Sequence, residues 1–173
     1  MKHILVARVE NKPGVLNRVA SLFRRRGFNI DSLTVGETEV PEISRMTIVV
    51  DASRTDATRV VHNLYKLVNV IAVEDISEQP SVVRDLVLLK VNADARTRPE
   101  IIQLTQVFRG KVVDVAPESL ILELTGEEDK IRSFIEVMRP FGILEMVRTG
   151  IVAMTRGSSP NGHAVARGNG SVV

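Results

Sequence analysis

The chain has 173 residues and a net charge of +2, with 44% hydrophobic and 25% charged residues and no cysteine. This length suits one domain or two small ones, and the lack of cysteine excludes disulfides, thiolate nucleophiles and cysteine-ligated metals. Aromatic residues make up only 3% and there is no Trp, which argues against a stacking platform for single-stranded nucleic acid.

The first half of the chain predicts the element order βαββαβ. An apolar run at residues 3–10 has the length of a strand, and residues 11–14 form a turn signal. Apolar residues then recur at helical spacing from Val15, and Gly27 supplies a helix stop. The other predicted elements are strands at 28–37, 46–50 and 68–76 and a helix that starts at Ser53, with Asp56 placed for a capping box.

The same order repeats after a predicted linker at residues 77–83. The repeat is one of element order and not of residue identity. The chain therefore predicts an α+β fold with two ferredoxin-like βαββαβ units in tandem, at 1–76 and 84–157, followed by a disordered tail at 158–173. The second unit has predicted strands at 84–92, 111–116, 119–125 and 143–154, a helix that begins near Pro99 and ends before Gly110, and a helix around 131–138.

The first predicted strand is apolar on both faces. Ile4 and Val6 alternate with Leu5, Ala7 and Val9, so neither face is expected to meet water. The helices of the unit cover one face. Since a lone unit of about 75 residues has a marginal core, we expect another unit, in this chain or in a second copy, to cover the other.

No catalytic constellation is found. His3, His62 and His163 have no metal-ligand spacing, and there is no nucleophile elbow, P-loop or dinucleotide fingerprint. The acidic run at 127–129 lies at a predicted helix start, where the helix dipole favours negative charge. We therefore predict no catalytic residue and no metal site. An enzyme with an unrecognised site is the alternative.

Charge and hydropathy also limit the partners. The dense basic run at residues 24–26 ends the first predicted helix, where the dipole favours each cation by about 0.3–1 kcal/mol; a contact with an acidic partner is the alternative. A DNA-binding stripe is not seen, no apolar stretch approaches the roughly 20 residues of a membrane span, and residues 1–10 lack the pattern of a signal peptide. We expect no nucleic-acid partner, no membrane partner and a cytoplasmic location.

The turn at residues 11–14 favours the binding of a small amino acid. The first N–H groups of the following helix lack intrahelical partners and carry the positive end of its dipole, so a carboxylate can dock there. Gly14 lets a ligand approach the backbone, Asn11 can accept from an ammonium group or donate to a carboxylate, and Val15 and Leu16 add an apolar wall. A plain strand-to-helix connection would explain the same residues.

Asn29 and Ile30 are candidates for the other half of this site. They begin the second predicted strand, just after Gly27. In a ferredoxin-like unit they would lie too far around to close the site from the same chain. Across a two-fold axis they can reach Gly14 of a neighbouring copy.

Several long runs in both halves carry a resemblance to a known family. They are NKPGVLNRVASLFRRRGFNIDSLTVGETE and SRMTIVVD in the first half, and LVLLKV, GKVVDV, SLILELTG and FIEVMRPFGILEMVRTGIVAMTRG in the second. These runs resemble the regulatory (small) subunit of acetohydroxyacid synthase, also called acetolactate synthase. The resemblance covers residues 1–157 and is most specific in the first half, which is similar to the N-terminal ACT domain of that family.

The resemblance implies a non-catalytic regulatory subunit. Such a chain raises the activity of a separate catalytic subunit and confers feedback inhibition by a branched-chain amino acid, usually valine. Thiamine diphosphate, Mg and FAD are expected only in the catalytic subunit, and this chain is expected to hold no cofactor. The implied effector site lies between the ACT domains of a homodimer, with Asn11, Gly14, Val15 and Leu16 from one chain and Asn29 and Ile30 from the other.

Two alternatives stay open. A stand-alone ACT-type sensor could regulate another enzyme or transcription, although no helix-turn-helix is predicted. If the source is a eukaryote, the location would be an organelle, after removal of a targeting segment not present in this sequence.

Overall fold

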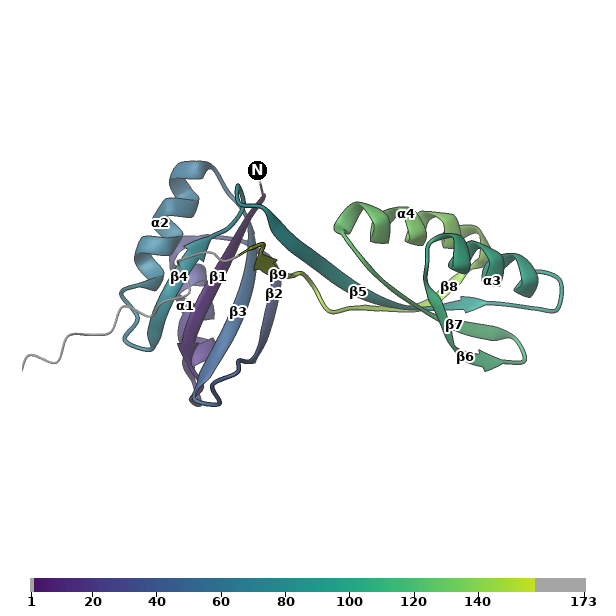
Figure 1. The fold of residues 1–173 in the computed structure, drawn as a ribbon, viewed down its shortest axis with the longest axis horizontal. Helices are drawn as coiled ribbons and strands as arrows, with labels where there is room; N and C mark the ends of the chain where they lie inside the picture. Colours follow the sequence, from purple (N-terminus) through teal and green to yellow (C-terminus); the bar gives the residue numbers. More distant parts are fainter. Residues whose placement is uncertain (1, 158–173) are drawn as a thin grey trace, which may run out of the picture. The chain divides into compact units, whose positions relative to one another are not determined.

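The computed structural model describes residues 2–157 and divides the chain into two compact units. The first unit holds residues 1–82 and the segment that starts at Met154, and the second holds residues 83–153. Each has two helices on one face of an antiparallel sheet (Figure 1), which confirms the predicted α+β class. The predicted tail at 158–173, which includes His163, lies outside the described residues.

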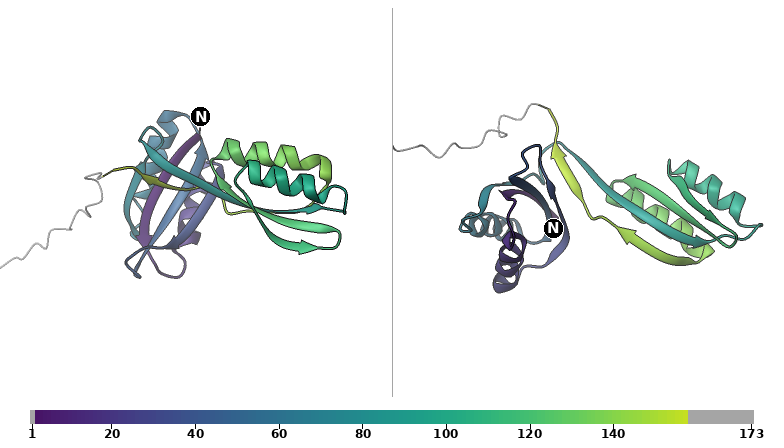
Figure 2. Two further views of the ribbon diagram at one scale, coloured as in Figure 1. Left: turned by 45° about the vertical axis from the view of Figure 1, so that its right-hand side comes forward. Right: turned by 90° about the horizontal axis from the view of Figure 1, so that it is seen from below.

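The first unit has the predicted order βαββαβ and a sheet with the strand order β2-β3-β1-β4. All neighbouring strands in it are antiparallel. Strands β2 and β4 are therefore its edges, while both helices cover one face (Figure 2). The elements are β1 (Lys2–Glu10), α1 (Val15–Arg26), β2 (Ile30–Glu37), β3 (Ile43–Asp51), α2 (Arg54–Leu64) and β4 (Val70–Asp75).

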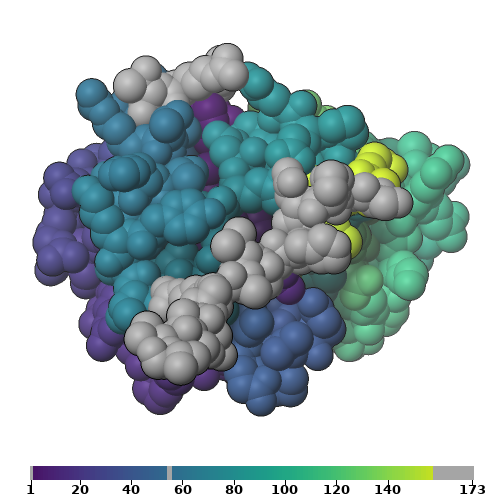
Figure 3. All heavy atoms as spheres, turned by 60° about the vertical axis from the view of Figure 1, so that its left-hand side comes forward, coloured from purple at the N-terminus to yellow at the C-terminus, as the bar shows by residue number. Residues whose placement is uncertain are grey.

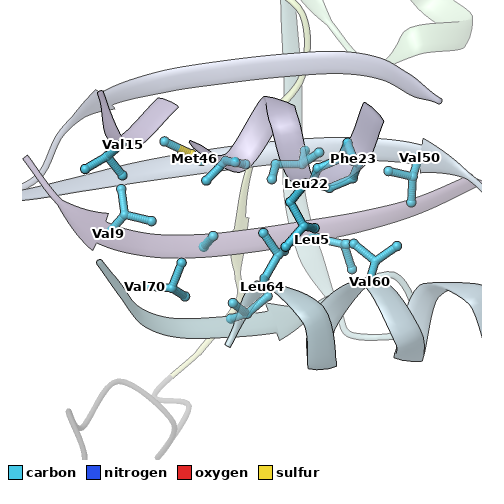
Figure 4. Packing of buried hydrophobic residues seen from close by; sticks show 14 residues of the cluster. Leu5, Val9, Val15, Leu22, Phe23, Met46, Val50, Val60, Leu64 and Val70 are labelled. Atoms are coloured by element: carbon cyan, nitrogen blue, oxygen red, sulfur yellow. The ribbon is translucent and has the colours of Figure 1, made fainter. Parts of the chain in front are cut away.

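An aliphatic core lies between this sheet and its helices (Figure 4). Alternate residues of β1 point into it, and Leu5 and Ala7 have no exposed surface. Phe23 of α1 lies edge-on to Phe28, with ring centroids 6.4 Å apart. Helix α2 packs against β4, and their atoms are adjacent on the face seen in Figure 3. Burial of each of these aliphatic side chains stabilises the fold by about 1.5–3 kcal/mol relative to leaving it exposed.

Residues on the opposite face of this sheet are also buried. Val6 is 5% exposed and Val49 is 1% exposed, although the register places both on the side away from Leu5 and Ile48. The expectation that neither face of the first strand meets water is therefore met at Val6. That a neighbouring unit covers this face stays a prediction.

The second unit repeats the order, with the sheet order β6-β7-β5-β8 and β9 paired to β5. Its core is again aliphatic, with Phe134 packed edge-on against Phe108 at 5.3 Å between centroids. The elements from β5 onward are β5 (Ser81–Asn92), α3 (Arg98–Val107), β6 (Lys111–Ala116), β7 (Ser119–Gly126), α4 (Glu128–Met138), the 3-10 helix η1 (Arg139–Phe141), β8 (Ile143–Arg148) and β9 (Val152–Thr155), and the first residues of β5 and the last of β9 belong to the first unit.

Two predicted boundaries in this half are wrong. The single strand predicted at 143–154 is broken, because Gly150 adopts a left-handed φ of 85° and Thr149 turns to exchange hydrogen bonds with Leu86 of β5. Strand β5 begins at Ser81, inside the predicted linker at 77–83, because its first residues extend the pairing of β5 with β9.

The predicted helix ends are confirmed. The Ser53 hydroxyl accepts from the backbone N–H of Asp56 at 3.2 Å, which caps α2. Glu128 and Asp129 lie in the first turn of α4, and the basic run 24–26 forms the last turn of α1. Both placements suit the helix dipole.

His3 and Asp75 join the first and last strands of the first unit. His3 is buried, and its Nδ1 lies 2.9 Å from Asp75 Oδ2. The Ser77 backbone N–H also donates to Asp75, at 3.0 Å. Burial alone would raise the pKa of Asp75, but the hydrogen bonds from Ser77 and His3 outweigh it and hold that pKa below the usual carboxyl value.

A pH dependence of folding follows from this lowered pKa. A carboxyl group with a lowered folded-state pKa stabilises the fold above its unfolded pKa of about 3.9, and this contribution is lost as the pH falls through the folded value. We expect Asp75→Asn to lower stability near neutral pH and to flatten the acid limb of the stability profile. Urea unfolding between pH 2 and 7 measures this, with the exposed Asp114→Asn as control. An acid limb as steep as that of the wild type would contradict the assignment.

Candidate functional site

The turn between β1 and α1 leaves the start of the helix open. Gly14 is the N-cap residue of α1, with φ 85° and ψ −9°, a left-handed conformation that favours glycine. No side chain caps this helix and its first turn holds no acidic residue. Nothing lies within 4 Å of where a Gly14 Cβ would be. The positive end of α1 is therefore accessible to a ligand at Gly14.

The backbone N–H groups at this end of α1 differ in whether they have a hydrogen-bond acceptor. The Val15 N–H donates to the Lys12 carbonyl at 3.3 Å. Among residues 2–157 no acceptor is found for the N–H groups of Leu16 and Asn17. These two donors lie in the first turn of α1, just after the turn at residues 11–14. A ligand carboxylate can accept hydrogen bonds from them.

Asn11 is held by the β2–β3 hairpin. Its side-chain nitrogen donates to the Pro41 carbonyl at 2.9 Å and to Glu37 Oε1 at 3.4 Å. Its Oδ1 accepts no hydrogen bond in the described part of the chain. Of the two roles predicted for this amide, the geometry favours acceptance from an ammonium group, since the nitrogen is already in use.

The two predicted apolar residues point in different directions. Val15 is 5% exposed and packs into the core of the first unit (Figure 4), so its side chain supports the turn from below. Leu16 is 45% exposed. Leu16 is therefore the one of the pair whose side chain a ligand can touch.

Asn29 and Ile30 lie far from Gly14 within one chain. Ile30 pairs with Val50 at one end of β2, whereas Glu37, which contacts Asn11, closes the other end. Seven residue steps separate the two ends, about 23 Å in a strand. Asn29 donates to Asp31 at 2.8 Å. One chain alone thus does not bring together the six residues predicted for the site.

Two residues beside the turn were not predicted as site residues. Glu37 approaches Asn11, and Val35 lies two residues earlier on the same face of β2, 41% exposed. The alternation of apolar residues along this strand is the signal that could have singled out Val35.

The described residues contain no other candidate centre. No group of three or more His, Asp and Glu residues suited to a metal ion occurs between residues 2 and 157. Within the same range, every helix is too short or too polar to cross a bilayer. His3 is paired with Asp75 in the sheet, and His62 lies on α2.

Comparison with known proteins gives consistent matches over both units. Residues 5–72 match the AHAS small subunit-like ACT domain, and residues 84–157 match the family described as the small subunit of acetolactate synthase. A probable acetolactate synthase small subunit of Archaeoglobus fulgidus is 54% identical over 158 residues, which is 91% of this chain and 99% of that protein.

Further relatives agree with this. A putative acetolactate synthase small subunit of Mycobacterium tuberculosis is 48% identical over 165 residues, 95% of this chain and 97% of that protein. The crystal structure of an acetolactate synthase small subunit from Thermotoga maritima superposes with a TM-score of 0.85 at 42% identity, covering 92% of this chain and 99% of that one. The chain therefore belongs to the acetolactate synthase small-subunit family, and its N-terminal unit is an ACT domain.

Proposed function

We propose that this chain binds a branched-chain amino acid at the Gly14 end of α1 and thereby regulates a separate catalytic subunit of acetolactate synthase. It raises the activity of that subunit and transmits feedback inhibition when the amino acid is bound. The observation that carries the proposal is the uncapped, glycine-initiated start of α1, in a chain of this family.

The turn offers a partner for each part of a zwitterionic ligand. The carboxylate would accept from the backbone N–H groups of Leu16 and Asn17. The ammonium would donate to Asn11 Oδ1, with Glu37 nearby as a compensating charge. The aliphatic side chain would lie on Leu16, which is half exposed. Together these contacts select an α-amino acid with an apolar side chain.

A homodimer paired along β2 would complete the site. Strand β2 is an edge of its sheet and, among residues 2–157, pairs with β3 on one side. If two copies paired antiparallel about a two-fold axis, Ile30 of one copy would lie opposite Glu37 of the other. Asn29 and Ile30 would then reach the Asn11 turn of the second copy, from which they are separated within one chain.

Cofactor chemistry is assigned to the other subunit. Thiamine diphosphate, Mg and FAD would be held by the catalytic subunit, and the small subunit would act through its contact surface. A regulatory effect of tens of fold requires a coupling free energy of only about 1–3 kcal/mol. Ordering of a dimer interface around a small ligand is sufficient for an effect of this size.

The test combines binding with activity. Isothermal titration of the full chain with valine, leucine and isoleucine should give micromolar to millimolar affinity for at least one of them, about 4–8 kcal/mol. Adding the chain to the purified catalytic subunit should raise acetolactate formation, and the bound amino acid should lower it again. No binding of any branched-chain amino acid, or no change in the activity of the catalytic subunit, would refute the proposal.

A further inference from the structure

We infer that Val35, together with Leu16, forms the apolar side of the effector site and that the size of the residue at position 35 sets which branched-chain amino acid is preferred. The inference rests on the proposed function and adds a specificity-determining residue to it. Two half-exposed aliphatic side chains, at an edge of the sheet and beside the open helix end, carry it.

Val35 lies on the helix side of β2. It is paired with Met46, which is 1% exposed and belongs to the core beneath the helices. Paired residues of neighbouring strands point to the same face, so the Val35 side chain points toward the helix layer. Yet Val35 is 41% exposed, whereas Leu33, two residues earlier on the same face, packs against the core. The helix layer therefore leaves Val35 partly uncovered.

Leu16 faces the same edge of the sheet. Arg18 of α1 donates to Asn69, in the connection between α2 and β4, which fixes the flank of α1 that faces α2. Leu16 is two residues before Arg18 and so lies about 200° around the helix axis. It consequently points to the β2 side of α1, and its 45% exposure shows that nothing in the described part of the chain fully covers it.

Polar groups flank these two side chains on the side of the turn. Glu37 lies two residues beyond Val35 on the same face of β2, and its carboxylate contacts Asn11. The free N–H groups at the start of α1 come from Leu16 itself and the residue after it. An amino acid held by its carboxylate and ammonium at these groups would therefore direct its side chain toward Leu16 and Val35.

The size of residue 35 should decide how long a side chain is accepted. Valine branches at Cβ and leucine one carbon further out, so a shorter residue at position 35 should admit leucine. Adding or removing one methylene in an apolar pocket changes discrimination by roughly 10–200-fold. We expect Val35→Ala to move the ratio of leucine to valine affinity by about tenfold toward leucine, and Val35→Leu to move it toward valine and alanine.

The experiment is a calorimetric titration of the full chain with valine, leucine, isoleucine and alanine. Wild type, Val35→Ala and Val35→Leu are compared, and light scattering on the same samples reports the mass. Ile71→Ala is the matched control, because Ile71 is a 43% exposed β-branched residue on β4, the opposite edge of the same sheet. The control should keep the wild-type order of affinities.

The outcomes separate this inference from the proposed function. If the wild type binds no branched-chain amino acid, the proposed function fails. If the wild type binds and the affinity ratios in both Val35 variants stay unchanged, the proposed function stands and the role of Val35 is refuted. An equal loss of affinity for all four amino acids in the Val35 variants would also refute a specificity role. So would a shift of the affinity ratio in Ile71→Ala as large as that in Val35→Ala, since either result would indicate a general effect on the fold or on the dimer.

Discussion

Replacing Gly14 with aspartate should weaken the binding of a branched-chain amino acid by at least about 100-fold while leaving the fold intact. The new carboxylate would lie at the positive end of α1, where it would compete for the free backbone donors and repel the ligand carboxylate. Space is not limiting, since no atom lies within 4 Å of a Cβ at this position. Aspartate tolerates the left-handed φ of 85° better than most residues do.

Thermal unfolding and calorimetry on the same variant separate the two effects. Strain at the left-handed φ of residue 14 should cost about 1–2 kcal/mol in a non-glycine variant, so the melting temperature of Gly14→Asp should fall by several degrees while unfolding stays cooperative. Gly14→Asn is the matched control, because asparagine has nearly the same shape and tolerates the same φ but carries no charge. The affinity of Gly14→Asn for valine should lie between those of the wild type and Gly14→Asp. Unchanged valine affinity in Gly14→Asp would mean that the ligand does not use this helix end.

The elements of both units could be predicted from the sequence because local patterns determine them. The apolar stripe of α1 has the spacing of a helix, and Gly27 at its end adopts the left-handed conformation that terminates it. Ser53 caps α2 as the sequence predicts. The break between β8 and β9 is not predicted because apolar residues occur on both sides of Thr149 and Gly150. Only the hydrogen bonds of Thr149 with Leu86 of β5 show where that strand turns.

The geometry of the candidate site could be predicted only in part. The open start of α1 at Gly14 follows from the local sequence. Which of Val15 and Leu16 is buried and which is exposed depends on the rotation of α1 about its axis relative to the sheet. Periodicity does not fix this rotation at the first turn of a helix. The exposure of Val35 could not be predicted for a related reason: it arises because α1 leaves the edge strand partly uncovered, and no property of the single residue reveals this.

Truncation of Phe134 to alanine should be the most damaging core substitution in the second unit. Phe134 is fully buried and packs edge-on against Phe108, with centroids 5.3 Å apart. Loss of a buried phenylalanine ring costs about 3–5 kcal/mol, and a unit of roughly 70 residues has a stability of only about 4–10 kcal/mol. The variant should therefore lose a large part of the stability of the second unit, and this unit should unfold at a clearly lower urea concentration than in the wild type.

The same variant tests which unit binds valine and which unit contacts the catalytic subunit. The first unit has its own core and contains the whole Gly14 turn, so valine binding measured by calorimetry should survive in Phe134→Ala while the urea midpoint of the second unit, followed by far-UV circular dichroism, falls. Phe134→Leu is the control and should cost clearly less, because most of the buried volume is kept. If the catalytic subunit is no longer stimulated although valine still binds, its contact surface lies on the second unit. A loss of stability below about 1 kcal/mol in Phe134→Ala would contradict the packing of this core. Removal of a fully buried ring costs this little only where a neighbouring side chain fills the space.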